Sequence, residues 1–461
     1  MEFIGREQEL NRLQQVAQSK RQEVLLVYGR RRVGKSELLR HFLQQRQGND
    51  IYYECKQTSE MNNVESLGRL LSDQFAYPPL GFQNIEQLLE FLFQKACQEP
   101  FVLVLDEYPY LRQAVTGMDS ILQALIDKYA ERSQLKLVLC GSFVETMRSL
   151  LLAHNPLYGR ITSALSVQPM DYYDAAKFYP EFTPEDKVRL YSVFGGIPYY
   201  NRWIDATLSV EQNIIQLLVE PGARLENEIL YYLQGELTRL TNANEVFDAL
   251  SRGFSRFGDL LAQSHISSSP ALADVLKRLM LMELVRKEAP INDVGNRKKT
   301  GYYIQEPLAV FFYRYLYRYA SQRRIMQSTV FYERYIKEDF ARSYVPKCFE
   351  EICRQFLIRQ NRQGKLAEPF EQIGKFYYDL PQEHRNGEFD VVTKDRIGYV
   401  FYEAKFRSTP VTAAMMQQEI TQVNTTGLYC HQYGFFSRAG FADEPLSRQD
   451  IVTYQLSDLY V

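Results

Sequence analysis

The sequence predicts an α/β protein with a parallel sheet near its N-terminus and a second α/β region near its C-terminus. Its 461 residues correspond to about three domains of ordinary size. Near the N-terminus, short apolar runs alternate with helical patterns, and such runs are typical of strands buried on both faces. Because helices separate these runs, we expect parallel connections between the strands. The runs lie at residues 23–28, 51–55, 101–105 and 135–140.

The composition is that of an ordered globular chain. Apolar residues make up 45% and charged residues 24%, and no apolar run approaches the roughly 18 residues of a membrane helix. A net charge of −2 excludes a strongly basic protein as a description of the whole chain, although not a local basic face. The N-terminus lacks a signal-peptide pattern, and the six cysteines are scattered. We therefore expect a cytoplasmic protein with free thiols and no membrane partner.

The middle of the chain is predicted to be mainly helical. Residues 171–240 follow a helical pattern that is interrupted once, by the Gly-Gly-Ile-Pro sequence at 195–198. Short helices come next, and they are followed by two strand patterns at 285–288 and 301–305. Short helices followed by a hairpin are the pattern of a winged helix.

The C-terminal part returns to mixed α/β patterns. A helix, three strands and a second helix are expected near residues 349–360, 375–379, 388–392, 399–404 and 412–423. The whole chain is thus divided into a sheet domain, a helical lid, a winged-helix domain and a C-terminal α/β domain. We place these four domains at residues 1–170, 171–240, 241–325 and 326–461.

A phosphate-binding loop follows the first predicted strand. The pattern G-x-x-x-x-G-K-[ST] is matched at every position by Gly29, Arg30, Arg31, Arg32, Val33, Gly34, Lys35 and Ser36. Its glycines allow backbone N–H groups to surround a phosphate, and the following helix adds the positive end of its dipole. Lys35 is expected to reach the β- and γ-phosphates of a nucleotide, and Ser36 to ligate Mg²⁺. A chance glycine-rich turn is disfavoured by the strand and helix on either side.

Two carboxylates, Asp106 and Glu107, follow the apolar run at 101–105. Carboxylates at the end of a buried strand are costly unless they have a role. Beside a phosphate loop, Asp106 is expected to hold Mg²⁺ through water and Glu107 to polarise an attacking water. The alternative is a strand that exits into solvent.

Two further residues are candidates for contact with the γ-phosphate. Ser142 follows the run at 135–140, where a polar residue lies beside the γ-phosphate in many parallel sheets, and a helix N-cap is its alternative role. Arg160 is expected to stabilise γ-phosphate charge, either in its own subunit or in a neighbouring copy of a homo-oligomer. A structural salt bridge is the alternative for Arg160.

Together these residues resemble the archaeal-type P-loop ATPases of the AAA and STAND group. The resemblance also includes Phe-Ile-Gly-Arg-Glu at residues 3–7 and the Gly-Gly-Ile-Pro sequence that ends in Pro198. It implies ATP as the ligand, a P-loop NTPase sheet with an extra strand between the phosphate-loop strand and the strand of Asp106, and contact of Pro198 with the nucleotide base. It further implies a winged helix and a nuclease-like C-terminal domain.

A second group of chemically active side chains is predicted in the C-terminal domain. Asp390 lies on one predicted strand, and Glu403 and Lys405 lie two residues apart on the next, so that the latter two share a face. If the strands pair, two carboxylates and a lysine converge, which is a layout for binding Mg²⁺ and activating water against a phosphodiester. Glu350, in the preceding helix, is a further candidate ligand.

This second group resembles the PD-(D/E)xK motif of restriction-endonuclease-like folds. Phe389, rather than Pro, precedes Asp390. The resemblance implies a metal-dependent nuclease in which Asp390, Glu403 and Lys405 are catalytic. The alternative is an edge hairpin that carries a surface ion pair between Glu403 and Lys405 or Arg407.

Basic and Tyr-rich segments predict DNA as a partner. Residues 311–347 interleave Tyr with Arg, as nucleic-acid surfaces do, although the same residues also form domain interfaces. Tyr302 is a candidate for stacking on a base. Candidate phosphate contacts near the hairpin are Arg256, Lys277, Arg278, Arg297, Lys298 and Lys299.

Three functions are open at this point. The first is a Mg²⁺-dependent ATPase of AAA/STAND type that couples ATP to a nucleic-acid-directed nuclease-like domain. The second is an ATP-driven signalling switch whose C-terminal domain binds DNA or a protein without cleavage. The third is a transcription regulator that uses the winged helix alone.

Overall fold

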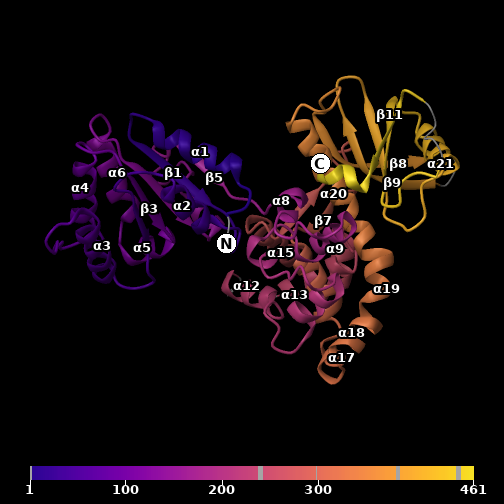
Figure 1. Cartoon of the computed structure of the whole chain (residues 1–461), viewed down its shortest axis with the longest axis horizontal. Helices are drawn as coiled ribbons and strands as arrows, with labels where there is room; N and C mark the ends of the chain where they lie inside the picture. Colours follow the sequence, from indigo (N-terminus) through magenta and orange to yellow (C-terminus); the bar gives the residue numbers. More distant parts are fainter. Residues whose placement is uncertain (1–2, 237–241, 297, 381–384, 443–447) are drawn as a thin grey trace. The chain divides into compact units, whose positions relative to one another are not determined.

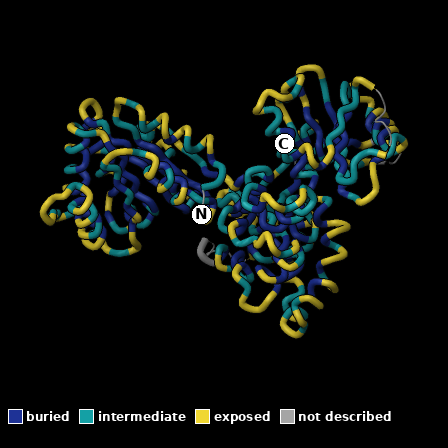
Figure 2. The backbone as a smooth tube through the Cα atoms, viewed as in Figure 1, coloured by how far each residue is buried: buried dark blue, intermediate teal, exposed yellow. Residues whose placement is uncertain are grey.

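The computed structural model describes residues 3–236, 242–296, 298–380, 385–442 and 448–461. Contacts divide the chain into two compact units, Met1–Pro169 and Met170–Val461 (Figure 1). Buried residues lie in the inner strands of both sheets and on the packed faces of helices, and exposed residues are frequent in the loops (Figure 2). No helix among the described residues is both long and apolar enough to span a membrane. All six cysteines lie in the described part and are free thiols.

The first unit is built on a five-stranded parallel sheet, as the apolar runs predicted. In spatial order its strands are β2 (Ile51–Glu54), β3 (Val102–Asp106), β4 (Lys136–Gly141), β1 (Glu23–Tyr28) and β5 (Ser163–Ser166). The first four are the predicted strands, with ends shifted by at most one residue. Strand β5 was not predicted, because its four residues, Ser-Ala-Leu-Ser, form no longer apolar run and are half-buried or exposed.

Strand β4 lies between β1 and β3 and every one of its residues is buried. This is the extra strand that the resemblance to P-loop ATPases implied. Because all these strands are parallel, their carboxyl ends meet at one edge of the sheet, where ligands bind in open α/β folds. The phosphate loop after β1, Asp106 on β3 and Gly141 on β4 therefore come together.

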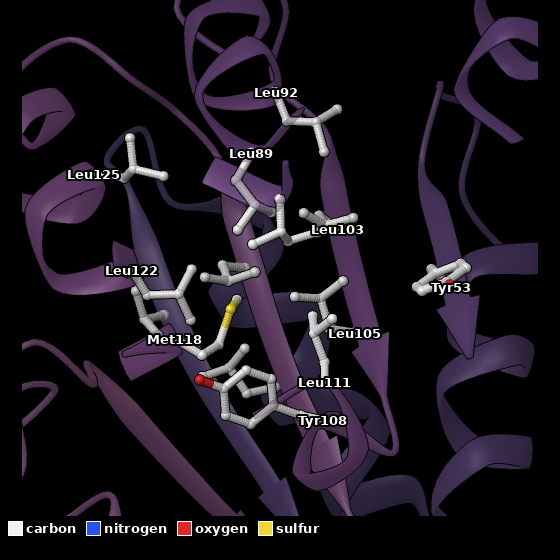
Figure 3. Packing of buried hydrophobic residues seen from close by; sticks show 14 of the residues in the cluster. Tyr53, Leu89, Leu92, Leu103, Leu105, Tyr108, Leu111, Met118, Leu122 and Leu125 are labelled. Carbon is white, nitrogen blue, oxygen red and sulfur yellow. The ribbon is translucent and has the colours of Figure 1, made fainter. Parts of the chain in front are cut away.

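Helices on both faces cover this sheet and bury a leucine-rich core. Leu89 and Leu92 of α4 pack with Leu122 of α6 against Leu103 of β3 (Figure 3). Burying one such side chain stabilises the fold by about 1.5–3 kcal/mol. The helices of this unit are α1 (Glu7–Gln18), α2 (Lys35–Gln44), α3 (Glu60–Phe75), α4 (Ile85–Lys95), α5 (Tyr108–Ala114), α6 (Met118–Tyr129) and α7 (Val144–Ser149).

The second unit begins with the predicted helical segment. Its predicted break is present, because α9 ends at Phe194 and α10 begins at Pro198. A side chain at Gly196 would put Cβ at 1.8 Å from the carbonyl oxygen of Met170, so this position accepts only glycine. The segment comprises α8 (Tyr172–Ala176), α9 (Pro184–Phe194), α10 (Pro198–Asn201), α11 (Val210–Ile214), the π-helical η1 (Ile215–Val219) and α12 (Glu228–Glu236).

Three helices and an antiparallel hairpin follow, as the sequence predicted. The hairpin pairs Val285 with Ile304 and Glu288 with Gly301. Arg297, one of the predicted phosphate contacts, lies outside the described residues. These elements are α13 (Ala243–Ser251), α14 (Phe257–Gln263), α15 (Ser269–Leu281), β6 (Val285–Glu288) and β7 (Gly301–Ile304).

The Tyr- and Arg-rich segment that comes next is largely core. Tyr313, Tyr315 and Tyr344 are at most 2% exposed, and Arg314 makes a double ion pair with Asp339 at 2.7 and 2.8 Å. The prediction that this segment is a nucleic-acid surface is therefore wrong for these tyrosines, because they fill helix interfaces. Its elements are α16 (Pro307–Phe311), η2 (Phe312–Tyr317), α17 (Ala320–Ile325), α18 (Ser328–Tyr335), α19 (Lys337–Asp339) and η3 (Phe340–Tyr344).

A mixed five-stranded sheet completes the second unit, in the order β12-β11-β10-β9-β8. Strands β8, β9 and β10 are antiparallel neighbours, and β10, β11 and β12 are parallel. Strands β11 and β12 were not predicted, since β11 starts with polar, half-exposed residues. The elements are α20 (Val345–Arg362), β8 (Gln372–Leu380), β9 (Arg385–Lys394), β10 (Tyr399–Lys405), α21 (Ala413–Asn424), β11 (Cys430–Ser437), β12 (Ile451–Gln455) and the 3-10 turn η5 (Leu456–Tyr460).

Candidate functional site

The phosphate loop joins β1 to α2, and its shape requires glycine at both ends. Gly29 has φ 156°, and a Cβ there would lie 2.3 Å from the carbonyl oxygen of Val167. Gly34 has φ 94° and caps the N-terminus of α2. Between them, Arg30 and Val33 are buried, and Arg32 is exposed. The motif is thus folded as a curled loop in front of a helix N-terminus, which is the geometry that binds phosphate.

Lys35 is buried within this loop and its ammonium group is held by three acceptors. Nζ donates to the carbonyl oxygens of Gly29 at 2.7 Å and Arg30 at 2.9 Å, and to Oγ of Ser142 at 3.1 Å. The side chain is 5% exposed. The lysine therefore lies along the loop that would cradle a phosphate, next to the serine that ends β4.

Asp106 is a carboxylate of the site that accepts several hydrogen bonds. Its Oδ2 accepts a hydrogen bond from Ser36 Oγ at 2.6 Å and another from the Tyr52 hydroxyl, and its Oδ1 accepts from the N–H of Glu107 at 2.9 Å. Burial raises the pKa of Asp106, but hydrogen bonds from Cys140, Ser36 and Tyr52 outweigh it and lower the pKa overall. Asp106 is therefore an anion held beside the Ser36 hydroxyl, as a magnesium-binding pair requires.

The backbone conformation of Glu107 and a hydrogen bond from Ser142 together position the Glu107 carboxylate. It adopts φ 49°, a left-handed conformation, where β3 turns into α5. Oε1 accepts a hydrogen bond from Ser142 Oγ at 2.9 Å, and among the described residues the buried Oε2 has no hydrogen-bond partner. Ser142 consequently joins Lys35 to Glu107. A buried carboxylate oxygen without a donor is expected where a water or substrate supplies the missing bond.

Two residues at this site were not singled out in the sequence. Tyr52, on β2, reaches Asp106 because β2 lies next to β3, with Glu54 opposite Asp106. Arg6 was noted only within residues 3–7, and its guanidinium donates to the carbonyl oxygen of Val33 at 2.8 Å. Arg6 ties the N-terminal segment to the phosphate loop. The strand order that brings Tyr52 to Asp106 has no signal in the sequence.

The remaining predicted residues of the nucleotide site are Arg160 and Pro198. Arg160 makes a double ion pair with Asp127 of α6, at 2.9 and 2.8 Å, which is the structural alternative considered for it. Its contact with γ-phosphate stays a prediction. Pro198 opens α10 in the second unit, and its contact with a nucleotide base also stays a prediction.

The predicted C-terminal residues lie on α20, β9 and β10. Val391 is opposite Tyr402, so the next positions along the two strands are Asp390 and Glu403. Lys405 Nζ lies 2.5 Å from Glu403 Oε1, which confirms that these two side chains share a face. Glu350 is half-buried on α20, with Lys347 Nζ at 3.9 Å.

Two residues that the sequence did not point to complete this group. Lys375, on β8, donates to Asp390 Oδ1 at 2.6 Å and to Glu388 Oε1 at 2.9 Å. Glu419, on α21, accepts from Lys405 Nζ at 3.1 Å. Only the pairing of β8 with β9, and of α21 with the sheet, brings them there. We call the set Glu350, Lys375, Asp390, Glu403, Lys405 and Glu419 the carboxylate–lysine site.

Like charges are crowded in the carboxylate–lysine site. Burial raises the pKa of Glu350 to about 7, and the charges of Asp390 and Glu403 add to this effect. Burial also raises the pKa of Glu403, together with the charge of Glu419. Within the described residues, no three His, Cys, Asp or Glu side chains are arranged as a ready-made set of metal ligands. Lys375 bonds Asp390 and Lys405 bonds Glu403, so part of this negative charge is paired within the protein.

Comparisons with known proteins agree with the first unit's site. Residues 3–201 match a family described as an ATPase domain predominantly from Archaea. Residues 312–422, which include the whole carboxylate–lysine site, match a family of archaeal and bacterial proteins of unknown function. A protein of Methanocaldococcus jannaschii, described as uncharacterized, is 26% identical over 394 residues, which cover 85% of this chain and 84% of the relative.

A solved structure shares the fold of this chain. The Walker-type ATPase of Pyrococcus abyssi is 20% identical with a TM-score of 0.51, and the match covers 68% of this chain and 96% of that one. The ORC2 protein of Aeropyrum pernix, solved with ADPNP and ADP, is 14% identical with a TM-score of 0.41, covering 66% of this chain and 90% of that one. Residues 3–201 are thus similar to an archaeal-type ATPase domain.

Proposed function

We propose that this protein is a Mg²⁺-dependent ATPase whose nucleotide cycle controls a nucleic-acid-directed, metal-dependent nuclease-like domain. In this proposal residues 171–240 form a helical lid, residues 241–325 a winged helix, and residues 326–461 a domain of the PD-(D/E)xK type. The nucleotide state would act through the lid and the winged helix on the carboxylate–lysine site. The protein's working compartment would be the cytoplasm.

The hydrogen-bonded chain from Lys35 through Ser142 to Glu107 is the single observation that carries the ATPase part. One hydroxyl at the end of β4 contacts both the phosphate-binding lysine and the carboxylate beside it. In the proposed reaction, Lys35 holds the β- and γ-phosphate oxygens and Glu107 polarises the attacking water through its unbonded Oε2. Ser142 would report the presence of the γ-phosphate to Glu107.

The residues at this site fit Mg²⁺. Ser36 Oγ and Asp106 Oδ2 lie 2.6 Å apart, and Asp106 is held as an anion by its hydrogen bonds. A hydroxyl that binds directly and a carboxylate that binds through water form the donor set that phosphate-bound magnesium prefers. When bound, the cation would neutralise charge on the phosphate oxygens.

The nuclease-like part is supported by side-chain chemistry and by the order of elements around it. A helix carrying Glu350 precedes an antiparallel meander carrying Asp390 and Glu403, and a parallel strand follows after α21. Burial, with neighbouring carboxylate charges as a smaller cause, raises the pKa of Glu350 and of Glu403. A divalent cation would relieve the repulsion among these carboxylates, and Lys405 would stabilise developing charge on a phosphodiester.

A cleavage assay tests this proposal. Plasmid, linear and single-stranded DNA are incubated with Mg²⁺ or Mn²⁺, with and without ATP, using the wild type, Asp390→Ala and Lys35→Ala. Asp379→Ala, an exposed aspartate on β8, is the matched control. We expect cleavage by the wild type and the control, loss of cleavage in Asp390→Ala, and altered ATP dependence in Lys35→Ala. Absence of cleavage in a preparation that hydrolyses ATP would contradict the nuclease part.

One observation favours a second function, an ATP-driven switch without cleavage. Lys375 bonds Asp390 and Lys405 bonds Glu403, so two of the site's carboxylates are paired with cationic side chains of the protein itself. In that case the C-terminal domain would bind DNA or a protein partner. ATP hydrolysis without any cleavage, together with nucleotide-dependent binding of DNA, is the result that this alternative expects.

A further inference from the structure

Lys375 has an unusually complete set of contacts for a lysine on an edge strand. Its Nζ bonds both Asp390 Oδ1 at 2.6 Å and Glu388 Oε1 at 2.9 Å, and its side chain is only 12% exposed. The ring of Tyr303 lies 5.5 Å from Nζ. Because ordinary strand lysines extend into water, a buried ammonium group with two carboxylate partners indicates a specific role.

The backbone around Lys375 is irregular at the point where it faces Asp390. Along the β8–β9 pair, Gly374 is opposite Val392, and Phe376 is opposite Phe389. One residue of β8, Lys375, therefore faces two residues of β9, Asp390 and Val391. Such a β-bulge changes the direction in which a side chain points and is frequent beside active sites.

A segment from outside the sheet holds the other edge of β8 in place. The N–H of Ile291 donates to the carbonyl oxygen of Lys375 at 2.8 Å. Asn292 Nδ2 donates to the carbonyl oxygen of Tyr377 at 2.7 Å, and Asn292 Oδ1 accepts from the N–H of Tyr377 at 3.1 Å. Ile291 also lies so close that a Cβ at Gly374 would be 2.7 Å from its Cγ2. We call residues 290–292 the edge clasp.

The two lysines of the site engage their carboxylates in the same way. Lys375 bonds one oxygen of Asp390, and Lys405 bonds one oxygen of Glu403. Within the described residues, Oδ2 of Asp390 makes no hydrogen bond, although that side chain is 32% exposed. Each carboxylate thus keeps a second oxygen available to a ligand.

We propose that Lys375 is a positioning residue of the carboxylate–lysine site, which holds Asp390 by Oδ1 so that Oδ2 is presented to a divalent cation. The inference rests on the proposed function, because it assigns a role within the same site. The edge clasp and the bulge fix Lys375 from both sides, so the lysine stays in place when the cation binds. The edge clasp precedes β7, so the hairpin region contacts the site through Lys375.

The test is a calorimetric titration of the full-length protein with Mn²⁺ in the absence of nucleotide. The binding event that Asp390→Ala removes identifies the C-terminal site. We expect Lys375→Met to weaken that event about tenfold, as outer-shell partners of metal ligands commonly do. Lys375→Arg is expected to restore part of the loss. Lys394→Met, the same change at an exposed lysine four positions beyond Asp390 on β9, is expected to change nothing.

The outcomes separate this inference from the proposed function. Unchanged or tighter Mn²⁺ binding in Lys375→Met overturns the inference and leaves the metal site standing. If the wild type shows no event that Asp390→Ala removes, the metal site itself is refuted and the inference falls with it. Should Lys375→Met fail to fold, the test uses Asn292→Ala, which removes the two side-chain hydrogen bonds of the edge clasp to Tyr377. A two- to threefold loss of Mn²⁺ affinity in Asn292→Ala supports the positioning role of Lys375, and unchanged Mn²⁺ affinity overturns it.

Discussion

The two sites of this molecule are assembled in opposite ways. At the phosphate loop, consecutive residues from Gly29 to Ser36 supply most of the site, and the neighbouring strands and their ends add Tyr52, Asp106, Glu107 and Ser142. In the carboxylate–lysine site, by contrast, the functional side chains come from three strands of a meander and from two flanking helices. Its residues span the chain from Glu350 to Glu419.

The difference is also one of chemistry. The phosphate loop offers backbone N–H groups to an anion, and their positions follow from φ angles at Gly29 and Gly34. The carboxylate–lysine site depends on side chains of opposite charge, whose positions follow from strand register. A local motif therefore tolerates changes elsewhere in the fold, whereas a site built on register is lost when one strand shifts.

The largest effect is expected at the phosphate loop. Lys35→Ala removes the ammonium group that contacts Gly29, Arg30 and Ser142, so we expect ATP hydrolysis to fall by at least about 10²–10³-fold. Phosphate release measures this, with Lys20→Ala, an exposed lysine of the same unit, as control. A normal rate of ATP hydrolysis in Lys35→Ala would show that the loop is not part of the catalytic site.

Glu107→Gln tests whether hydrolysis needs the carboxylate rather than the shape of the side chain. The amide keeps an acceptor for Ser142 but is a much weaker base, so we expect ATP to bind normally and to be hydrolysed about 10²-fold more slowly. Equilibrium ATP binding and single-turnover hydrolysis measure the two steps separately. Hydrolysis at the wild-type rate would exclude Glu107 as the base.

Tyr52 and Tyr53 give a matched pair on one strand. The Tyr52 hydroxyl bonds Asp106, whereas the Tyr53 hydroxyl bonds Asn63 on the opposite face of β2. We expect Tyr52→Phe to raise the Mg²⁺ concentration needed for half-maximal hydrolysis about tenfold. Tyr53→Phe should instead cost about 1 kcal/mol of stability and leave the Mg²⁺ dependence unchanged. Equal Mg²⁺ curves for both variants would show that Tyr52 is only structural.

The smallest effect concerns the register of β9 and β10. Asp395, in the turn between them, accepts the N–H groups of Ile397 and Gly398 at 2.8 and 2.9 Å and pairs with His431 at 2.8 Å. Burial raises its pKa, but these hydrogen bonds outweigh burial and lower the pKa overall. Asp395→Asn is expected to lose about 1–2 kcal/mol of stability at pH 7, while ATP hydrolysis is unchanged.

The pH dependence of that loss has a definite sign. The folded pKa of Asp395 is lower than the unfolded value of about 3.9, so its stabilisation is complete above that value and disappears as the pH falls through the folded pKa. Urea unfolding of the second unit should therefore show a difference between wild type and Asp395→Asn at pH 7 that shrinks below about pH 4. Asp379→Asn, on an exposed position, serves as control. A constant difference at all pH values would contradict the assignment.

The sequence anticipated some parts of the sites and not others. The phosphate loop, Asp106, Glu107 and Ser142 were predicted, and the structure brings them into hydrogen-bond contact. The sequence led us to expect Arg160 at the γ-phosphate, yet its guanidinium pairs with Asp127. A nearby carboxylate competes with a phosphate for any arginine. The tyrosines of residues 311–347 were predicted at a surface, and those at 313, 315 and 344 are core. Composition does not distinguish a stacking tyrosine from a packing one.

What the sequence determined by itself was local. A glycine with positive φ, a lysine at a helix N-terminus and an apolar strand that ends in carboxylates have the same consequence in any fold, because their geometry is set within a few residues. Only the tertiary structure decided that β2 places Tyr52 on Asp106, and that β9, which carries a bulge opposite Lys375 of β8, places Asp390 on that lysine. Strand order and register depend on the packing of whole faces, so no short pattern in the sequence records them.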